Sequence, residues 1–225
     1  MQTDYALGSD GTEILSAVFR GRLRGLNEII LATGAPLEGN LFYFQGATDL
    51  ADCPDPARAH KRRNLYRAIQ GKHRFLEVGF NAGHSALLAL SAAPDLTYLG
   101  VDIASNPYTR LCAALMSHWF GDRFLFVAGD SREMLPAIWL QGGRGFDLIH
   151  VDGGHGAGTC LADLVNAVHV AEPAGAHLLL DDTGHAPIRA LYERLRHAGL
   201  LQTDDCGRTW EGGENLLARV LPRGA

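Results

Sequence analysis

An acid and an imidazole stand where a buried strand is expected to end. The stretch FDLIHVDGGHGAG, residues 146–158, begins as an apolar run and stops at Asp152, two glycines and His155. Burying a carboxylate or an imidazole costs free energy unless the group is paired or binds something. We therefore expect a ligand at this turn.

Four more apolar runs also end in or just before an acid. The runs 74–79, 96–102, 123–130, 146–152 and 176–182 are short and bounded by Gly, Pro or Asp, which predicts five strands. Segments with helical apolar spacing separate them, which predicts a parallel sheet with helices on both faces. The acids are Glu77, Asp102, Asp130, Asp152 and the pair Asp181 and Asp182. Because the carboxyl ends of parallel strands form the ligand crevice, these acids should converge on one edge.

The first of these strands leads into a glycine loop, EVGFNAGHS, residues 77–85. Gly79 and Gly83 permit a tight turn before a helix that starts near Ser85. The dinucleotide fingerprint is GxGxxG, whereas the pattern here is ExGxxxG. Glu77, facing the loop, would repel a pyrophosphate and attract a positively charged ligand. The pattern favours S-adenosylmethionine and disfavours the alternative of an NAD-dependent oxidoreductase.

The next two acids suit the other parts of a nucleoside. Asp102 lies 23 residues after Gly79, where a carboxylate can accept hydrogen bonds from both ribose hydroxyls. Asp130 and Ser131 are then placed to bind the adenine. The alternative for Asp130 is that it only caps the following helix.

Five motifs together resemble a known family: FLEVGFNAGHSALLAL, GVDIA, GDSREMLP, FDLIHVDGGH and LLLDDT. In this order and spacing they resemble the class I S-adenosylmethionine-dependent methyltransferases. The resemblance is strongest to the metal-dependent branch that includes macrocin and other macrolide-sugar O-methyltransferases, and it covers residues 62 to about 183. It implies a Rossmann-like α/β fold with a mostly parallel seven-stranded sheet. The cofactor residues expected are Glu77, Gly79, Asn81, Gly83, His84, Ser85, Asp102, Ile103, Asp130, Ser131 and Asp152.

In that branch, the acid after the fourth strand and the acidic pair after the fifth coordinate a divalent cation. The resemblance assigns this role to Asp152, Asp181 and Asp182. Three crowded carboxylates would raise one another's pKa unless a hard cation such as Mg²⁺, or another divalent ion, neutralised them. A site of oxygen ligands alone argues against zinc.

The resemblance also names a general base. His155 occupies the place of the histidine that acts as base in the sugar O-methyltransferases, where the catechol O-methyltransferases have a lysine. His185 in DDTGH is the competing candidate for base or acceptor contact. His84 is expected to pack or to touch the cofactor through its backbone, and His150 to be a hydrogen-bonded residue within the sheet.

Residues 1–73 are expected to form a helical extension or lid within the same domain as the methyltransferase region, 74–225. Helices are predicted over 12–34 and 56–71, and the basic run His60–Arg63 is expected to be a solvated helix face. The aromatic loop EGNLFYFQGATDL between them could be a lid over the acceptor or part of the core. Two apolar stretches after residue 199 predict an antiparallel hairpin at the sheet edge.

Composition excludes several functional classes. The net charge of −5 gives no sign of a nucleic-acid surface, and no apolar run reaches the roughly 20 residues that span a bilayer. Four cysteines without a CxxC pair and a start unlike a signal peptide indicate reduced thiols in the cytoplasm. We expect a Mg²⁺-dependent O-methyltransferase for a small sugar-like or phenolic acceptor, with a homo-oligomer possible. The alternatives are an N-methyltransferase and a non-catalytic cofactor-binding subunit.

Overall fold

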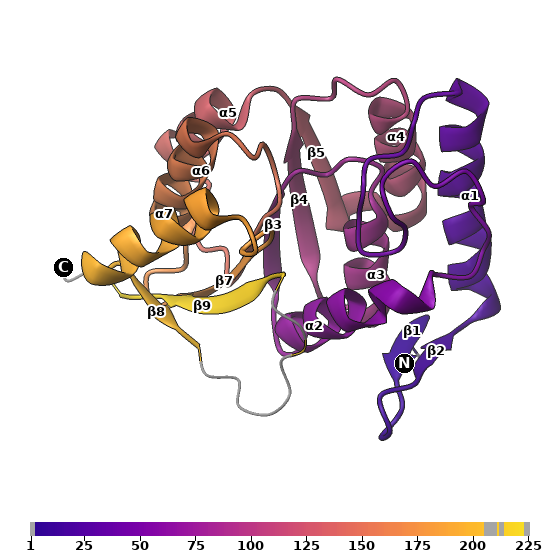
Figure 1. Cartoon of the computed structure of the whole chain (residues 1–225), viewed down its shortest axis with the longest axis horizontal. Helices are drawn as coiled ribbons and strands as arrows, with labels where there is room; N and C mark the ends of the chain where they lie inside the picture. Colours follow the sequence, from indigo (N-terminus) through magenta and orange to yellow (C-terminus); the bar gives the residue numbers. More distant parts are fainter. Residues whose placement is uncertain (1–2, 205–210, 212–213, 223–225) are drawn as a thin grey trace.

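The computed structural model describes residues 3–204, 211 and 214–222. Its main sheet has seven strands in the order β5-β4-β3-β6-β7-β9-β8 (Figure 1). The parallel strands are β3 (Arg74–Val78), β4 (Thr97–Asp102), β5 (Phe124–Ala128), β6 (Leu148–Val151) and β7 (Ala176–Leu180). β9 (Leu216–Val220) runs antiparallel to β7 and to β8 (Leu201–Thr203). The five predicted strands and the antiparallel C-terminal edge are confirmed.

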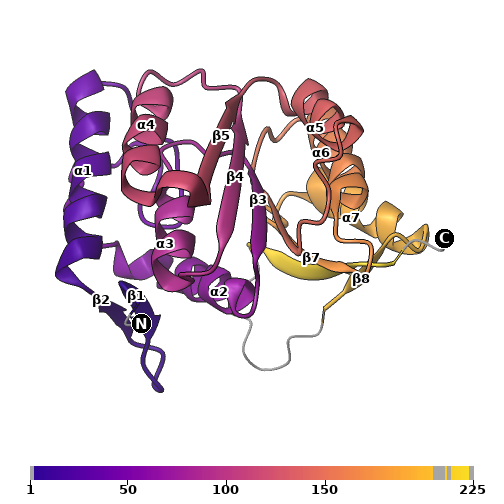
Figure 2. The ribbon, with the colours of Figure 1, turned by 180° about the vertical axis from the view of Figure 1, so that it is seen from behind.

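Helices cover both faces of this sheet (Figures 1 and 2). One face packs against α5 (Ser131–Leu140), α6 (Ala157–Val170) and α7 (Ala186–His197), and the other against α2 (Ala59–Ile69), α3 (His84–Ala92) and α4 (Thr109–Phe120). Short 3-10 turns precede α2 (Pro56–Arg58) and β5 (Gly121–Arg123). Successive strand residues alternate between the two hydrophobic cores, as Phe75 and Leu76 do in β3.

The first part of the chain differs from the prediction. β1 (Tyr5–Leu7) and β2 (Glu13–Leu15) form an antiparallel hairpin, so the helix expected from residue 12 is wrong over residues 13–15. The helix α1 (Ala17–Thr33) begins after Ser16, whose hydroxyl oxygen accepts the backbone N–H of Phe19 at 3.0 Å. A serine in this position is a strong N-cap, and it sets the start of the helix.

The basic run on α2 is not a solvated face. Lys61 and Arg62 are only 6% and 1% exposed. The Arg62 guanidinium donates to both carboxylate oxygens of Glu13, at 2.6 and 2.7 Å, and to the carbonyl oxygens of Leu41 and Asp55. The expectation of a solvated face is wrong because distant carboxylate and carbonyl groups accept these donors. Arg62 thereby joins β2, the loop before α2 and α2 itself.

The aromatic loop contributes to the core, one of the two roles considered for it. Phe42 and Tyr43 are buried in the core shared with α1 and α3, whereas Phe44 is about half exposed.

Among the described cysteines, Cys53, Cys112 and Cys160 are free thiols. Cys206 and most of the turn expected at 207–214 lie outside the described residues. None of the helices within the described ranges is long and apolar enough to cross a membrane.

Replacing Arg62 with Met should lower the free energy of unfolding by about 3–5 kcal/mol, because the partly buried Glu13 carboxylate loses its cation and two carbonyl groups lose a donor. Urea unfolding followed by circular dichroism measures this change. The control is Arg24→Met, since Arg24 is exposed and pairs with the surface residue Asp52, and it should cost less than about 1 kcal/mol. Equal losses in the two variants would show that Arg62 is not the anchor.

Candidate active site

The sheet order reverses beside β3, with β4 on one side and β6 on the other. At this point the backbone beyond β3 comes very close to the backbone beyond β6. Gly79 has a φ of +99°, and a Cβ there would lie 2.0 Å from the carbonyl oxygen of Asp152. Only glycine allows the two backbones to come this close. The crevice at the carboxyl ends of the strands lies at this point, where the strand order reverses.

A cavity of about 1080 Å³ occupies this crevice. Most of the residues predicted to bind the cofactor line this cavity. The two histidines predicted as bases and the three aspartates predicted to bind a metal line it too. The lining residues among them are Gly79, Asn81, His84, Ser85, Asp102, Ile103, Asp130, Ser131, Asp152, His155, Asp181, Asp182 and His185. Two predicted cofactor residues, Glu77 and Gly83, do not line the cavity.

Asp102 is held rigidly at the end of β4. One carboxylate oxygen accepts the backbone N–H of Asn81 and the other that of Ala104, each at 2.7 Å. Both donors belong to residues with positive φ, so the two loops curl around the carboxylate. Each oxygen keeps a lone pair for a further donor. Beside it, Ile103 presents an exposed apolar side chain to the cavity.

Asp130 both caps a helix and lines the cavity. Its carboxylate accepts the backbone N–H of Arg132 at 2.9 Å, so the capping role considered for it is real. The Arg132 side chain also donates to this carboxylate, and these bonds lower the pKa of Asp130 to about 2. Asp130 therefore stays ionised beside Ser131 at the rim of the cavity.

The side chain of Glu77 points away from the cavity, and that of His84 packs in the core as expected. Glu77 was expected to face the glycine loop, but its side chain is fully buried and accepts the Tyr98 hydroxyl and, at 2.9 Å, His150 Nδ1. That expectation is wrong because the cross-strand neighbour of Glu77 is His150, which takes up its carboxylate. His84 Nε2 bonds Asn27 at 3.0 Å, and burial lowers the pKa of His84 to about 3, so its ring is neutral.

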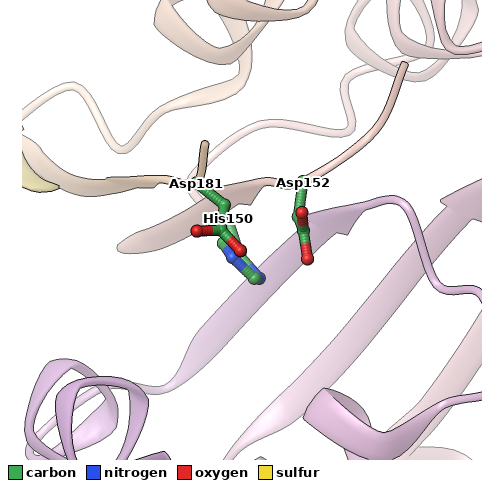
Figure 3. A group of neighbouring side chains, drawn as sticks. All are labelled: His150, Asp152 and Asp181. Carbon is green, nitrogen blue, oxygen red and sulfur yellow. The ribbon is translucent and has the colours of Figure 1, made fainter. Parts of the chain in front are cut away.

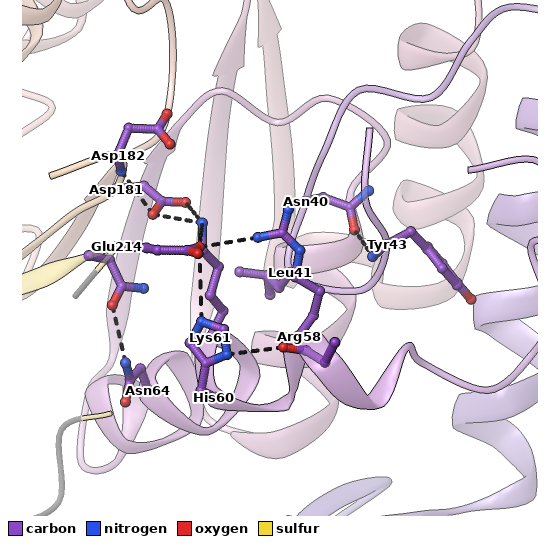
Figure 4. A network of polar contacts seen from close by, with 12 residues as sticks. Asn40, Leu41, Tyr43, Arg58, His60, Lys61, Asn64, Asp181, Asp182 and Glu214 are labelled. Carbon is purple, nitrogen blue, oxygen red and sulfur yellow. Dashed lines mark hydrogen bonds and ion pairs between the residues drawn. The ribbon is translucent and has the colours of Figure 1, made fainter. Parts of the chain in front are cut away.

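The other half of the cavity is built on two carboxylates. Val151 and Leu180 are register partners, so the residues after them, Asp152 and Asp181, lie side by side. Lys61 reaches from α2 and donates to both oxygens of Asp181, at 3.0 and 2.9 Å (Figure 4). Burial alone would lower the pKa of Lys61, but Asp181 and its acidic neighbours raise it, so the ammonium stays charged.

Within the described part of the chain, Asp152 has no such partner. Burial, followed by the charges of Asp181 and Glu77, raises its pKa well above the usual range for a carboxyl. In the absence of added positive charge, Asp152 therefore tends to hold a proton. A divalent cation between the two carboxylates would remove this penalty, so the donor chemistry of the pair fits a metal ion.

The structure assembles a different metal-ligand group from the one predicted. Within the described residues, the potential ligand atoms of His150, Asp152 and Asp181 lie within 4.8 Å of one another (Figure 3). Asp182, predicted as the third ligand, is not in this group, because its backbone has a φ of +55° and its carboxylate pairs with His155 Nε2. His150 was expected to be an ordinary sheet residue. Its two-residue spacing from Asp152 was a signal that both share one face of β6.

The two candidate bases lie next to each other at the cavity. The rings of His155 and His185 are 6.1 Å apart between centroids, and the His155 side chain is 64% exposed. The Asp182 carboxylate pairs with His155 and orients its ring, as the aspartate of a Ser-His-Asp triad orients the histidine. His185 sits at the N-terminus of α7.

Sequence reasoning missed the cations that border the acceptor side. The Arg58 guanidinium lies over the ring of Phe44, 4.1 Å from its centroid. It also bonds Glu214 at 3.2 Å (Figure 4). All three residues line the cavity. Lys61 also lies 3.4 Å from Glu214. The two contacts with Glu214 join residues more than a hundred positions apart, so no local pattern marks them.

Comparison with known proteins agrees with this arrangement. Residues 76–183 match the family described as "Methyltransferase domain". No curated protein sequence matches the chain. The fold resembles that of the O-methyltransferase from Bacillus cereus solved in complex with SAH, with a TM-score of 0.66, 16% identity, and coverage of 89% of this chain and 90% of that one.

Two further solved structures are similar. One is the O-methyltransferase TomG from Streptomyces achromogenes, involved in tomaymycin synthesis and bound to SAM (TM-score 0.61, 17% identity, 90% of each chain). The other is cofactor-bound Rv0187 from MTB (TM-score 0.61, 20% identity, 91% of each chain). The similarity to these structures, at identities of 16–20%, shows the fold alone. The activity rests on the family match. This match excludes the alternative of an NAD-dependent oxidoreductase. Residues 76–183 thus form a methyltransferase domain, and the chain is an S-adenosylmethionine-dependent methyltransferase.

Proposed function

We propose that this methyltransferase moves the methyl group of S-adenosylmethionine to a hydroxyl of a small sugar-like or phenolic acceptor, with the help of a divalent cation. The observation that carries the proposal is the single cavity with two unlike halves. Asp102, Asp130 and the glycine loop line one half, and Asp152, Asp181 and His155 line the other. Methyl donor and acceptor would meet between them.

The first half suits the donor. Asp102, already fixed by two backbone N–H groups, can accept the ribose hydroxyls through its remaining lone pairs. Ile103 offers an apolar surface for the adenine, and Asp130 with Ser131 can bind its polar edge. The Bacillus cereus and Streptomyces achromogenes enzymes, which share the fold, were solved with SAH and SAM.

The second half suits an acidified hydroxyl. Asp152 and Asp181 would hold the cation, which when bound supplies Lewis acidity to the acceptor oxygen; Mg²⁺ is compatible with this carboxylate pair. Asp182 is assigned the different task of orienting His155. Phe44 and Arg58 provide a flat, partly apolar wall for a ring or sugar.

The reaction then follows from these positions. His155 takes the proton of the acceptor hydroxyl, and Asp182 stabilises the imidazolium that results. The acceptor oxygen forms a bond to the methyl carbon as the carbon–sulfur bond breaks, and its electron pair remains on sulfur. S-adenosylhomocysteine and the methyl ether are the products.

Asp102→Ala should weaken S-adenosylhomocysteine binding by about 1.5–3 kcal/mol, or roughly ten- to a hundredfold, because hydrogen bonds to a charged acceptor are lost. Isothermal titration calorimetry measures it. Asp95→Ala is the matched control, since Asp95 is exposed in the turn before β4, and it should bind like the wild type. Native affinity in Asp102→Ala would mean that the ribose is held elsewhere.

His155→Ala should lower turnover by roughly 10²- to 10⁴-fold, the usual contribution of a positioned base, while S-adenosylhomocysteine affinity is unchanged. Turnover is read as S-adenosylhomocysteine released with the fastest acceptor from a panel of catechols and hexoses. His185→Ala serves as the comparison and should retain most of the activity. The reverse ranking would transfer the role of base to His185.

A further inference from the structure

His150 has a buried nitrogen that nothing in the described part of the chain satisfies. The side chain is 1% exposed, and Nε2 has no hydrogen-bond partner among the described residues. Leaving a buried polar atom without a hydrogen-bond partner destabilises the fold, so the retention of His150 in the core needs a reason. His150 lies two residues before Asp152 and on the same face of β6, beside the acidic pair (Figure 3).

Glu77 determines which nitrogen is free to accept. Its Oε1 lies 2.9 Å from His150 Nδ1, and its other oxygen accepts the Tyr98 hydroxyl. A carboxylate can only accept here, so the imidazole proton sits on Nδ1 and Nε2 keeps its lone pair. Carboxylate–histidine pairs of this kind orient imidazole ligands in metal sites.

We propose that His150 Nε2 is the third protein ligand of the cation, beside Asp152 and Asp181, and that Glu77 is its positioning partner. A nitrogen donor makes the site mixed, so it prefers a borderline ion such as Co²⁺ or Zn²⁺ over Mg²⁺, which favours oxygen ligands. This inference rests on the proposed function and deepens it by naming the third ligand and the class of ion. Three protein ligands leave positions open for an acceptor oxygen.

Lys61 does not block this arrangement. Its ammonium bonds Asp181, but Glu214 lies only 3.4 Å from the same nitrogen and is exposed enough to follow it. When a divalent ion binds, Lys61 can move fully onto Glu214. The charges of Asp152, Asp181 and Glu214 are then balanced by the ion and the ammonium together.

The test uses the full chain, stripped with EDTA and titrated with Co²⁺ alone and with Mg²⁺ alone. Calorimetry gives the affinities, and the visible absorption of bound Co²⁺ reports nitrogen ligation. The wild type should bind one Co²⁺ at least about tenfold more tightly than Mg²⁺. His150→Gln keeps a donor for Glu77 but should lose that preference and change the Co²⁺ spectrum. Glu77→Gln should weaken Co²⁺ binding by about 10–100-fold, the usual effect of removing the partner of a ligand.

The control His118→Gln alters an exposed histidine on α4 and should bind Co²⁺ like the wild type. Circular dichroism melting confirms that each variant folds. A His150→Gln protein with wild-type Co²⁺ affinity and spectrum would overturn the inference, as would a wild type that prefers Mg²⁺ or binds neither ion. Titration with S-adenosylhomocysteine separates the two proposals, since its failure would count against the methyl-transfer assignment while leaving the Co²⁺ result intact.

Discussion

Two carboxylates at the ends of adjacent buried strands must be kept from repelling each other, and the acceptor half of the site depends on this constraint. The register of β6 and β7 makes Asp152 and Asp181 neighbours, so their proximity follows from the sheet itself. Burial makes the repulsion stronger than it would be in water. Burial first, and the charge of Asp181 after it, raise the pKa of Asp152.

The positive charge that offsets this repulsion comes from the N-terminal part of the chain. α2 delivers Lys61 to Asp181, and the next residue, Arg62, fixes α2 to β2 and to the loop before it. The first seventy residues therefore share a core with the sheet and also complete the electrostatics of its active edge. A segment that the sequence describes as a basic helix becomes part of the site.

The strands, the order of their acids and most of the cavity lining could be predicted because their signals are local. Apolar runs of limited length, a glycine loop and an acid at each strand end are all read within ten residues. Lys61, Arg62 and Glu77 were misjudged because their roles depend on partners between 21 and 120 positions away. Asp182 was misassigned because one residue in the left-handed region turns its side chain toward His155. His150 could have been found from its alternation with Asp152.

We infer that a divalent cation, bound by Asp152 and Asp181, completes the charge balance and acidifies the acceptor hydroxyl. The most direct measurement is anomalous diffraction from crystals grown with S-adenosylhomocysteine and Mn²⁺. We predict a manganese peak at bonding distance from both carboxylates, with the Lys61 ammonium moved to Glu214 and the cofactor ribose on Asp102. A structure in which Lys61 still bonds Asp181 and no manganese peak appears between the carboxylates would contradict the account.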